Sequence, residues 1–449
     1  MKNSIISLAL FCFSFVNTIV AQDCNNRVSS LAQRPPMGWN SYNCFGGNAT
    51  EDEVKQNADY MAANLKQYGW EYVVLDFLWY CDDQNNPDTF ANRRPDQYID
   101  GFGRLIPSVK NHPSSANGQG LKPLGDYIHS KGLKFGIHIM RGMPRQAVEN
   151  NTPVLNSTAR AREVANVADT CLWYGGLVGL NMSKEGAQEY YNSIFRLYAS
   201  WGVDFIKVDD ISFPYHADEI EAVNEAINNC GRDIVLSLSP GPALIGNPRH
   251  LQANANLWRI SADFWDNWGS LIKQLHLCRQ WAPLVTEGHW PDADMLPLGH
   301  LAIRHEVRGN TDRYTNFTKE EQFFMMTLWS IFRSPLMMGG HMPDNDEFTK
   351  SLLTNSEVIR VNQYSTNNRE ISFDKGISVW AAEDKEKGDT YVAFLNINDQ
   401  PVTTKIPLSA INKTGEVKLR DLWNKSEKVI KGTMEVSVPA HGGLLFSVK

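Results

Sequence analysis

Short apolar segments alternate with longer amphipathic segments from Pro35 to about Asn362, and this alternation limits the possible folds more than any other feature. The apolar segments are PPMGWN (35–40), EYVVLDF (71–77), LKFGIHI (133–139), VDFIKVD (203–209), DIVLSLS (233–239), LWRIS (257–261), PLVTEG (283–288) and SPLMMGG (334–340). Helical patterns lie between most of them, for example at 51–68, 184–201 and 319–332. Eight apolar strands separated by helices predict an α/β fold, a parallel (β/α)8 TIM barrel.

A similarity between two segments of the chain supports this prediction. YGWEYVVLDF (68–77) and WGVDFIKVDD (201–210) align without gaps as aromatic-Gly-x-acid-aromatic-apolar-x-apolar-Asp. Each unit joins the end of a helix to a strand and delivers an aspartate at the carboxyl end of that strand. In a TIM barrel these ends form the active site.

The pattern changes after Asn362. Segments such as ISVWAAED (377–384) and EVKLRDLWN (416–424) alternate with a period of two residues and are separated by turn signals. We therefore predict a small antiparallel β-sandwich over 369–449, after a catalytic barrel over 35–368 and a short lead over 22–34.

Residues 1–21 are typical of a cleaved signal peptide, with Lys2 followed by an apolar run and a cleavage site near Ala21. We expect a secreted or periplasmic protein. Its net charge of −7 is spread over well-mixed acidic and basic residues, which gives no indication of nucleic-acid binding. The mean hydropathy of −0.36 and the lack of another long apolar run argue against a membrane span. The cysteines show no paired C-x-x-C zinc spacing, but some can form disulfides in an exported protein.

Polar and aromatic side chains gather at the predicted carboxyl ends of the strands. They are Trp39, Tyr42, Asp76, His138, Lys207, Asp209, Ser239, Arg259, Asp263, Asp292 and Asp294. This set suits a neutral polyol, because carboxylates and lysine bind hydroxyls and aromatic faces bind C–H surfaces. It equally suits a divalent metal, because aspartate clusters bind magnesium. The residue types alone leave both possibilities open.

Six motifs resemble those of a known family and favour the sugar-binding interpretation over the metal site. RPPMGWNSYNCFG, YVVLDFLWY, GLKFGIHI, VDFIKVDD, WRISADFWD and WPDADMLPLG resemble, in order, those of the alpha-galactosidase (melibiase) family, glycoside hydrolase family 27. The resemblance covers essentially the whole mature chain. It implies a retaining glycosidase with no metal and no organic cofactor.

The resemblance also implies roles for individual residues. Asp209 corresponds to the nucleophile and Asp263 to the general acid/base, which requires their carboxyl groups to lie ~5–5.5 Å apart. Lys207, Arg259 and Asp294 correspond to ligands of sugar hydroxyls. Tyr42 stands where the family usually has tryptophan in the pocket wall, and Asp76 and His138 complete the expected substrate-binding set. Asp210 receives no chemical role.

The sequence departs from the family pattern in three places, and the first two bear on specificity. Phe77 replaces the second of two aspartates, the one expected to bind the 6-hydroxyl of galactose, so a sugar without that group, beta-L-arabinopyranose, fits better. Ser239 stands where galactose-specific animal members have glutamate, which leaves room for an N-acetyl group at the 2-position. The family cysteine after the nucleophile is absent, while Cys44 and Cys81 match a neighbouring bridge and are expected to pair.

The sequence thus predicts a retaining exo-glycosidase acting on oligo- or polysaccharides with terminal alpha-D-galactosyl or beta-L-arabinopyranosyl units. The alternative within the class is an alpha-N-acetylgalactosaminidase. Two alternatives from other classes are a metal-dependent barrel enzyme and a catalytically silent sugar-binding protein.

Overall fold

A computed structural model of the chain describes residues 28, 30–82, 96–304 and 311–449. The predicted signal peptide, residues 1–21, lies outside the described residues. Within the described part of the chain, no helix is both long and apolar enough to cross a membrane.

Eight parallel strands form the barrel, as the alternation of apolar segments predicts. Their order around the sheet is β10-β9-β8-β7-β3-β2-β1-β13. An isolated parallel bridge between Leu296 and Met338 joins the two ends of the sheet and closes the ring. The strands are β1 (Met37–Asn40), β2 (Tyr72–Leu75), β3 (Lys134–Met140), β7 (Phe205–Asp209), β8 (Val235–Leu238), β9 (Leu257–Arg259), β10 (Trp290–Asp292) and β13 (Leu336–Met338).

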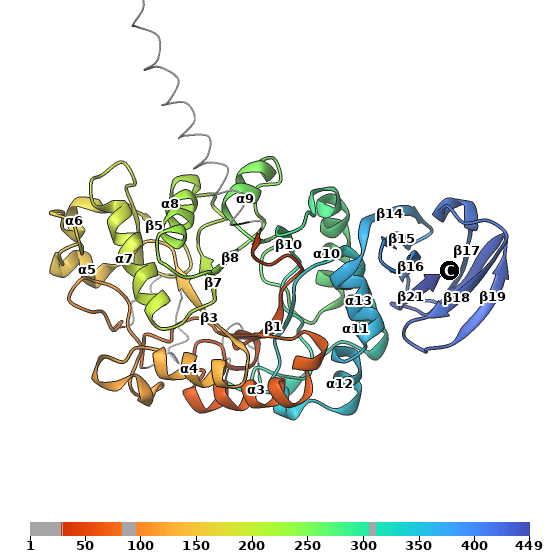
Figure 1. Cartoon of the computed structure of the whole chain (residues 1–449), viewed down its shortest axis with the longest axis horizontal. Helices are drawn as coiled ribbons and strands as arrows, with labels where there is room; N and C mark the ends of the chain where they lie inside the picture. Colours follow the sequence, from red (N-terminus) through yellow and green to blue (C-terminus); the bar gives the residue numbers. More distant parts are fainter. Residues whose placement is uncertain (1–27, 29, 83–95, 305–310) are drawn as a thin grey trace, which may run out of the picture.

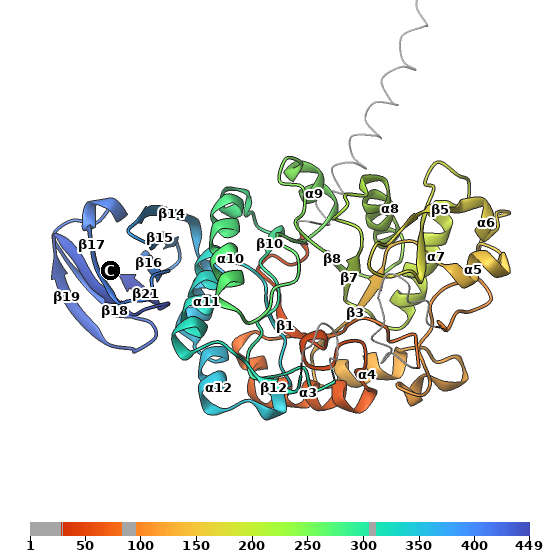
Figure 2. The same ribbon diagram turned by 180° about the vertical axis from the view of Figure 1, so that it is seen from behind.

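Helices surround this ring in Figures 1 and 2, with at least one between each strand and the next. The main ones are α3 (Glu51–Asn64), α4 (Lys122–Ser130), α7 (Ala187–Ser200), α8 (Ala217–Asn228), α9 (Pro248–Asn254), α10 (Trp268–Trp281), α11 (Lys319–Phe332), α12 (Glu347–Leu353) and α13 (Ser356–Tyr364). Helix α11 has the bounds that its pattern predicts. Its first turn is a capping box in which the Glu321 backbone N–H donates to the Thr318 hydroxyl and the Glu321 carboxylate accepts from the Thr318 backbone.

One predicted strand is wrong. The segment PLVTEG (283–288) forms the 3-10 helix η4 (Ala282–Leu284) and a tight turn closed by backbone bonds between Thr286 and His289. Gly288 adopts a positive φ of 81° in this turn, which reverses the chain. The strand at this position of the barrel is β10, which begins after the turn at Trp290.

The chain leaves the barrel between β3 and α7 to form a small antiparallel sheet in the order β4-β6-β5. This sheet consists of β4 (Met143–Pro144), β5 (Ala165–Thr170) and β6 (Leu177–Leu180), and the short helices α5 (Arg145–Asn150) and α6 (Ala161–Val164) lie between β4 and β5. The loop between β5 and β6 reaches the mouth of the barrel, where Leu172 and Trp173 line a cavity.

The C-terminal part is the predicted β-sandwich, and it lies to one side of the barrel beside α11 and α13 (Figures 1 and 2). Its first strand begins at residue 366, three residues before the predicted boundary at 369. A six-stranded sheet, β14-β15-β16-β21-β18-β19, faces a two-stranded sheet, β17-β20. The strands are β14 (Thr366–Asp374), β15 (Ile377–Asp384), β16 (Asp389–Asn396), β17 (Val402–Pro407), β18 (Glu416–Asp421), β19 (Glu427–Lys431), β20 (Thr433–Val438) and β21 (Gly443–Val448).

The expected disulfide between Cys44 and Cys81 is not formed, and this prediction is wrong. Both side chains are buried, reduced thiols. The Cys44 thiol lies 3.5 Å from the Ser41 carbonyl oxygen, to which it donates, so it is satisfied within its own short helix α2 (Tyr42–Phe45). Burial raises the pKa of this thiol well above its usual value.

Candidate active site

A cavity of about 480 Å³ opens at the carboxyl ends of the barrel strands. Its volume is in the range of small-molecule sites. Most of the substrate-site residues predicted from the sequence line it: Tyr42, Asp76, Phe77, His138, Lys207, Asp209, Asp263 and Asp294. The two others, Ser239 and Arg259, lie behind the wall of the cavity and are buried.

Asp209 ends strand β7 and is held from two sides. Its Oδ1 accepts a 2.9 Å bond from the backbone N–H of Asp210, and its Oδ2 lies 3.1 Å from Nε2 of His138. Because an ionised carboxylate only accepts hydrogen bonds, the histidine Nε2 carries the proton. Burial works to raise the pKa of Asp209, but His138, Lys207 and the backbone N–H outweigh it and lower the pKa. The carboxyl group is therefore ionised at neutral pH.

Lys207 and Asp76 form an ion pair at the base of the cavity. Lys207 Nζ lies 3.1 Å from Asp76 Oδ2, which also accepts a 2.7 Å bond from Asn40. Burial alone would lower the pKa of Lys207, yet the adjacent Asp76 and Asp209 raise it. Burial likewise opposes ionisation of Asp76, but Lys207 is the main partner that lowers the pKa of Asp76 well below its usual range. Both groups are charged, and together they offer a donor and acceptors for sugar hydroxyls.

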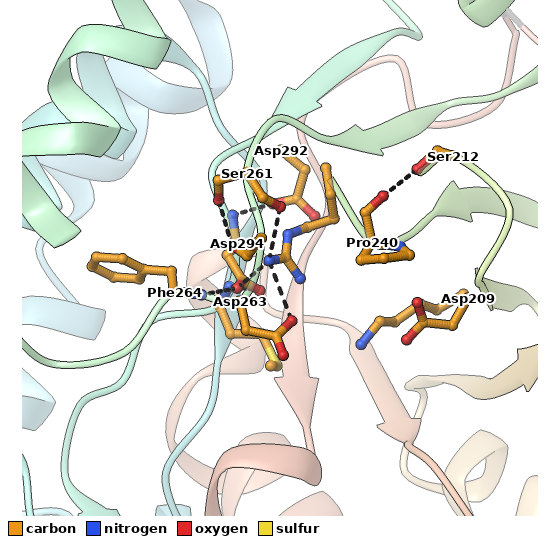
Figure 3. A network of polar contacts seen from close by, with 12 residues as sticks. Asp209, Ser212, Pro240, Ser261, Asp263, Phe264, Asp292 and Asp294 are labelled. Atoms are coloured by element: carbon orange, nitrogen blue, oxygen red, sulfur yellow. Dashed lines mark hydrogen bonds and ion pairs between the residues drawn. The ribbon is translucent and has the colours of Figure 1, made fainter. Parts of the chain in front are cut away.

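Asp263 lies on the opposite side of the cavity, in the loop after β9. Figure 3 shows its carboxyl group and that of Asp209, which ends β7, facing the same space. Its side chain is 40% exposed, and its Oδ1 lies 3.7 Å from Nη2 of Arg259. The same Nη2 lies 2.5 Å from Oδ2 of Asp294. Arg259 therefore pairs with both aspartates, and its role as a ligand of a sugar hydroxyl stays a prediction.

Asp294 is fixed by backbone groups as well as by Arg259. It accepts from the N–H groups of Phe264 at 2.7 Å and Met295 at 2.8 Å, and its own N–H donates to Asp292 at 2.8 Å. Burial raises the pKa of both aspartates, to about 6 for Asp292, although Arg259 works in the opposite direction. Two buried carboxyl groups this close to each other disfavour simultaneous ionisation.

Phe77 forms an apolar patch on the cavity wall beside Asp76. Its ring is only 4% exposed. It packs edge-on against His138 and Tyr174, with ring centroids 5.3 and 5.0 Å apart, and against Trp173 at 5.6 Å. The ring is therefore buried among three other aromatic rings.

Asp82 and Asp83 are the nearest acidic residues in sequence that could replace the missing aspartate. Asp82 turns away from the cavity, since its carboxylate accepts from the hydroxyls of Tyr98 and Ser108. Asp83 lies outside the described residues. Within the described part of the chain, the cavity wall next to Phe77 therefore receives no carboxylate from this segment.

Several lining residues were not predicted from the sequence. Pro240, Gly241 and Pro242 occupy the part of the wall that Ser239 was expected to form. Leu172, Trp173, Phe213, Pro214, Ala262 and Trp265 surround the mouth, while Asn43, Phe264 and Met295 lie deeper. Trp265 follows Asp263 in the motif WRISADFWD, which was the available signal; no pattern in the sequence points to Leu172 or Phe213.

A second charged cluster lies directly behind the nucleophile position. Arg141 Nη atoms bind Asp169 and Asp210 at 2.9 Å and Glu219 at 2.6 Å. Asp169, His216 and Glu219 also place ligand atoms within 4.8 Å of one another, a spacing that a divalent cation accepts. The guanidinium group already neutralises two of these three residues, so the geometry is that of an ion-pair network.

The comparisons with known proteins agree with this geometry. Residues 177–364 match the family described as "Alpha galactosidase A", and residues 374–448 match "Alpha galactosidase C-terminal beta sandwich domain". The crystal structure of a glycoside hydrolase family 27 beta-L-arabinopyranosidase from Geobacillus stearothermophilus is 48% identical, with a TM-score of 0.90 over 94% of this chain and 98% of that chain. The chain belongs to this family. It is a glycoside hydrolase of the alpha-galactosidase type, family 27.

Two other members of the family show its range. A putative alpha-N-acetylgalactosaminidase from Bacillus halodurans is 45% identical, with a TM-score of 0.83 over 92% of this chain and 97% of that chain. An alpha-galactosidase from Oryza sativa subsp. japonica is 27% identical over 92% of this chain and 84% of its own length. The names of these relatives thus specify different sugars.

Proposed function

We propose that this family 27 enzyme is a retaining exo-glycosidase that removes terminal beta-L-arabinopyranosyl units in preference to alpha-D-galactosyl units. The observation that carries the proposal is Phe77, a buried apolar side chain in the cavity wall beside the Asp76–Lys207 pair.

The mechanism requires two carboxyl groups in different states. Asp263 donates a proton to the leaving oxygen while ionised Asp209 attacks the anomeric carbon and forms a glycosyl-enzyme. Asp263 then deprotonates a water molecule, which releases the sugar with retained configuration. The lowered pKa of Asp209 supports its part, and the exposed position of Asp263 gives the leaving group and water access to the acid/base.

The preferred sugar follows from the apolar wall. Beta-L-arabinopyranose has the ring stereochemistry of galactose but no exocyclic CH2OH group. A 6-hydroxyl that enters the cavity beside Phe77 loses water and gains no partner from that side chain, which costs about 1–3 kcal/mol. A related enzyme from Geobacillus stearothermophilus carries the name beta-L-arabinopyranosidase, and a variant of it was solved in complex with arabinose.

The test is turnover of three nitrophenyl glycosides under the same conditions: the beta-L-arabinopyranoside, the alpha-D-galactoside and the alpha-N-acetylgalactosaminide. We expect kcat/KM to be highest for the arabinopyranoside, by about tenfold or more over the galactoside. A preference for the galactoside contradicts the role of Phe77. A preference for the N-acetylated sugar favours the alternative shared with the Bacillus halodurans relative.

A further inference from the structure

The mouth of the cavity differs in chemistry from its interior. Of the cavity-lining residues described in the structure, those that are exposed are apolar with the single exception of Asp263. We define the outer rim as these apolar residues and two half-buried tryptophans: Leu172, Phe213, Pro214, Pro242, Ala262, Trp173 and Trp265. Leu172 is 78% exposed and Phe213 is 54% exposed.

Four loops build the outer rim, so it does not arise from one irregular segment. Leu172 comes from the β5–β6 loop, Phe213 from the loop after β7, Pro242 from the loop after β8 and Trp265 from the loop after β9. The Ser212 hydroxyl donates a 2.6 Å bond to the Pro240 carbonyl and joins two of these loops, as Figure 3 shows. Single exposed apolar residues are ordinary on a protein surface, but a contiguous group around a cavity indicates a binding surface.

The interior offers the opposite chemistry. Asp76, Lys207 and Asp294 present polar groups around Asp209, and all lie deeper than the rim. These groups match the hydroxyls of one sugar ring. Farther out, the described side chains that line the cavity are Leu, Phe, Pro, Ala and Trp, and Asp263 supplies the one carboxylate among them.

We infer that the outer rim is a leaving-group subsite for an aglycone with an apolar or aromatic face. The inference rests on the proposed function, because it places the sugar inside the cavity and the glycosidic oxygen at Asp263. Asp263 is itself at the mouth, so atoms beyond that oxygen lie against the outer rim. A hydrophilic sugar chain there finds few hydrogen-bond partners, whereas an alkyl or aryl group buries its own surface and that of Leu172 and Phe213.

Inhibition by S-glycosides, which resist hydrolysis, separates binding of the aglycone from chemistry. Ki is measured for methyl and for octyl 1-thio-beta-L-arabinopyranoside against the nitrophenyl substrate. We expect the octyl compound to bind about tenfold or more tightly than the methyl compound. In the double variant Leu172→Ser/Phe213→Ser, this ratio falls towards one. Val429→Ser, which changes a residue that is 68% exposed on the sandwich, keeps the wild-type ratio.

Several outcomes overturn the inference. Equal Ki values for the two thioglycosides in the wild type do so, as does an unchanged ratio in the double variant. A double variant that changes oligomeric state in solution but keeps the ratio assigns the outer rim to a contact between copies of the chain. An unchanged Ki for free L-arabinose shows that the double variant is folded. If it is not folded, the ratio of Ki values is measured for the two single variants instead. If the enzyme prefers galactose, the ratio is measured with methyl and octyl 1-thio-alpha-D-galactopyranoside. An error in the proposed sugar is then distinguished from an error in the proposed leaving-group subsite.

Discussion

At the scale of single residues, the proposed mechanism divides catalysis between Asp209, at the end of β7, and Asp263, in the loop after β9. We expect Asp209→Asn and Asp263→Asn each to lower kcat/KM by at least about a thousandfold, because each removes one half of a double displacement. Steady-state hydrolysis of the nitrophenyl arabinopyranoside measures the loss. Azide added to Asp209→Gly is expected to restore partial turnover and to yield a glycosyl azide of inverted configuration. Turnover near the wild-type level in either asparagine variant removes that residue from the mechanism.

Phe77 is the residue that we propose to set the preferred sugar. Phe77→Asp introduces an acceptor for a 6-hydroxyl, so we expect the ratio of kcat/KM for galactoside to arabinopyranoside to rise by about tenfold to a hundredfold. Phe77→Leu is the control, since it removes ring volume without adding an acceptor. An equal rise in both variants attributes the preference to crowding alone, and no rise in either one contradicts the role of Phe77.

Asp292 makes stability depend on pH in a predictable direction. Burial raises the pKa of this carboxyl to about 6 in the folded chain, against about 3.9 when unfolded. Because the folded value is the higher one, stability falls as the pH rises through this interval. Asp292→Asn keeps an acceptor for the Asp294 N–H and removes the charge. We expect the variant to be more stable than wild type at pH 8, on the order of 2–3 kcal/mol, and equal to it at pH 4.

Urea unfolding at pH 4, 6 and 8 measures this difference. Asp374→Asn, at an exposed position in β14, serves as the control. Its free energy of unfolding should differ from that of the wild type by nearly zero at each pH. A constant difference for Asp292→Asn across the three values excludes titration of Asp292 as its cause.

At the scale of elements, Arg141 connects the end of β3 to the end of β7, which carries Asp209. Its backbone N–H donates to the Asp209 carbonyl and its Nε donates to the Asp210 carbonyl at 2.8 Å. Asp210 itself adopts a positive φ of 58°, which costs energy for a residue other than glycine. The arginine therefore holds the backbone that aims Asp209.

Replacement of Arg141 tests this connection. Arg141→Met leaves Asp210 and Glu219 buried without their counter-charge, so we expect a loss of about 3–5 kcal/mol in the free energy of unfolding. We also expect kcat to fall more than KM rises. Arg249→Met, at an exposed position of α9, is the matched control. Denaturant unfolding and initial rates measure both effects, and wild-type stability of Arg141→Met contradicts the proposed role of the network.

The elements also show what the sequence can and cannot predict. The barrel and most of the site follow from the sequence because parallel strands are apolar and end on polar residues at a common edge. Strand β10 was missed because it is only Trp-Pro-Asp and carries no apolar run. Leu172 and Phe213 were missed because they lie in loops whose position depends on long-range packing. The absent Cys44–Cys81 bridge shows that a family pattern does not fix the contacts of each thiol.

At the scale of the whole molecule, the sandwich is packed tightly against the barrel helix α11. The His441 ring stacks on Trp268 with centroids 3.9 Å apart, and its Nδ1 lies 2.9 Å from Glu321 Oε1 in the first turn of α11. The Trp423 indole N–H donates a 2.9 Å bond to the Thr327 hydroxyl in the same helix. Aromatic packing and hydrogen bonds thus tie the two domains together, and we expect them to unfold in one cooperative transition.

Gly443 tests this coupling, because strand β21 lies against the backbone of α11 at this residue. A Cβ atom added here would lie 2.6 Å from Phe324 Cα and 2.8 Å from the Phe323 carbonyl oxygen, both in the helix backbone. A helix backbone cannot yield as the end of a flexible side chain does, so Gly443→Ala forces the sandwich away from the barrel. We expect a loss of about 1–3 kcal/mol, still in a single transition detected by calorimetry. Gly246→Ala, where an added Cβ meets nothing within 4 Å, should change stability by less than about 0.5 kcal/mol. Two separated transitions in the wild type, or a Gly443→Ala variant as stable as the control, would show that the sandwich is not coupled to the barrel through this contact.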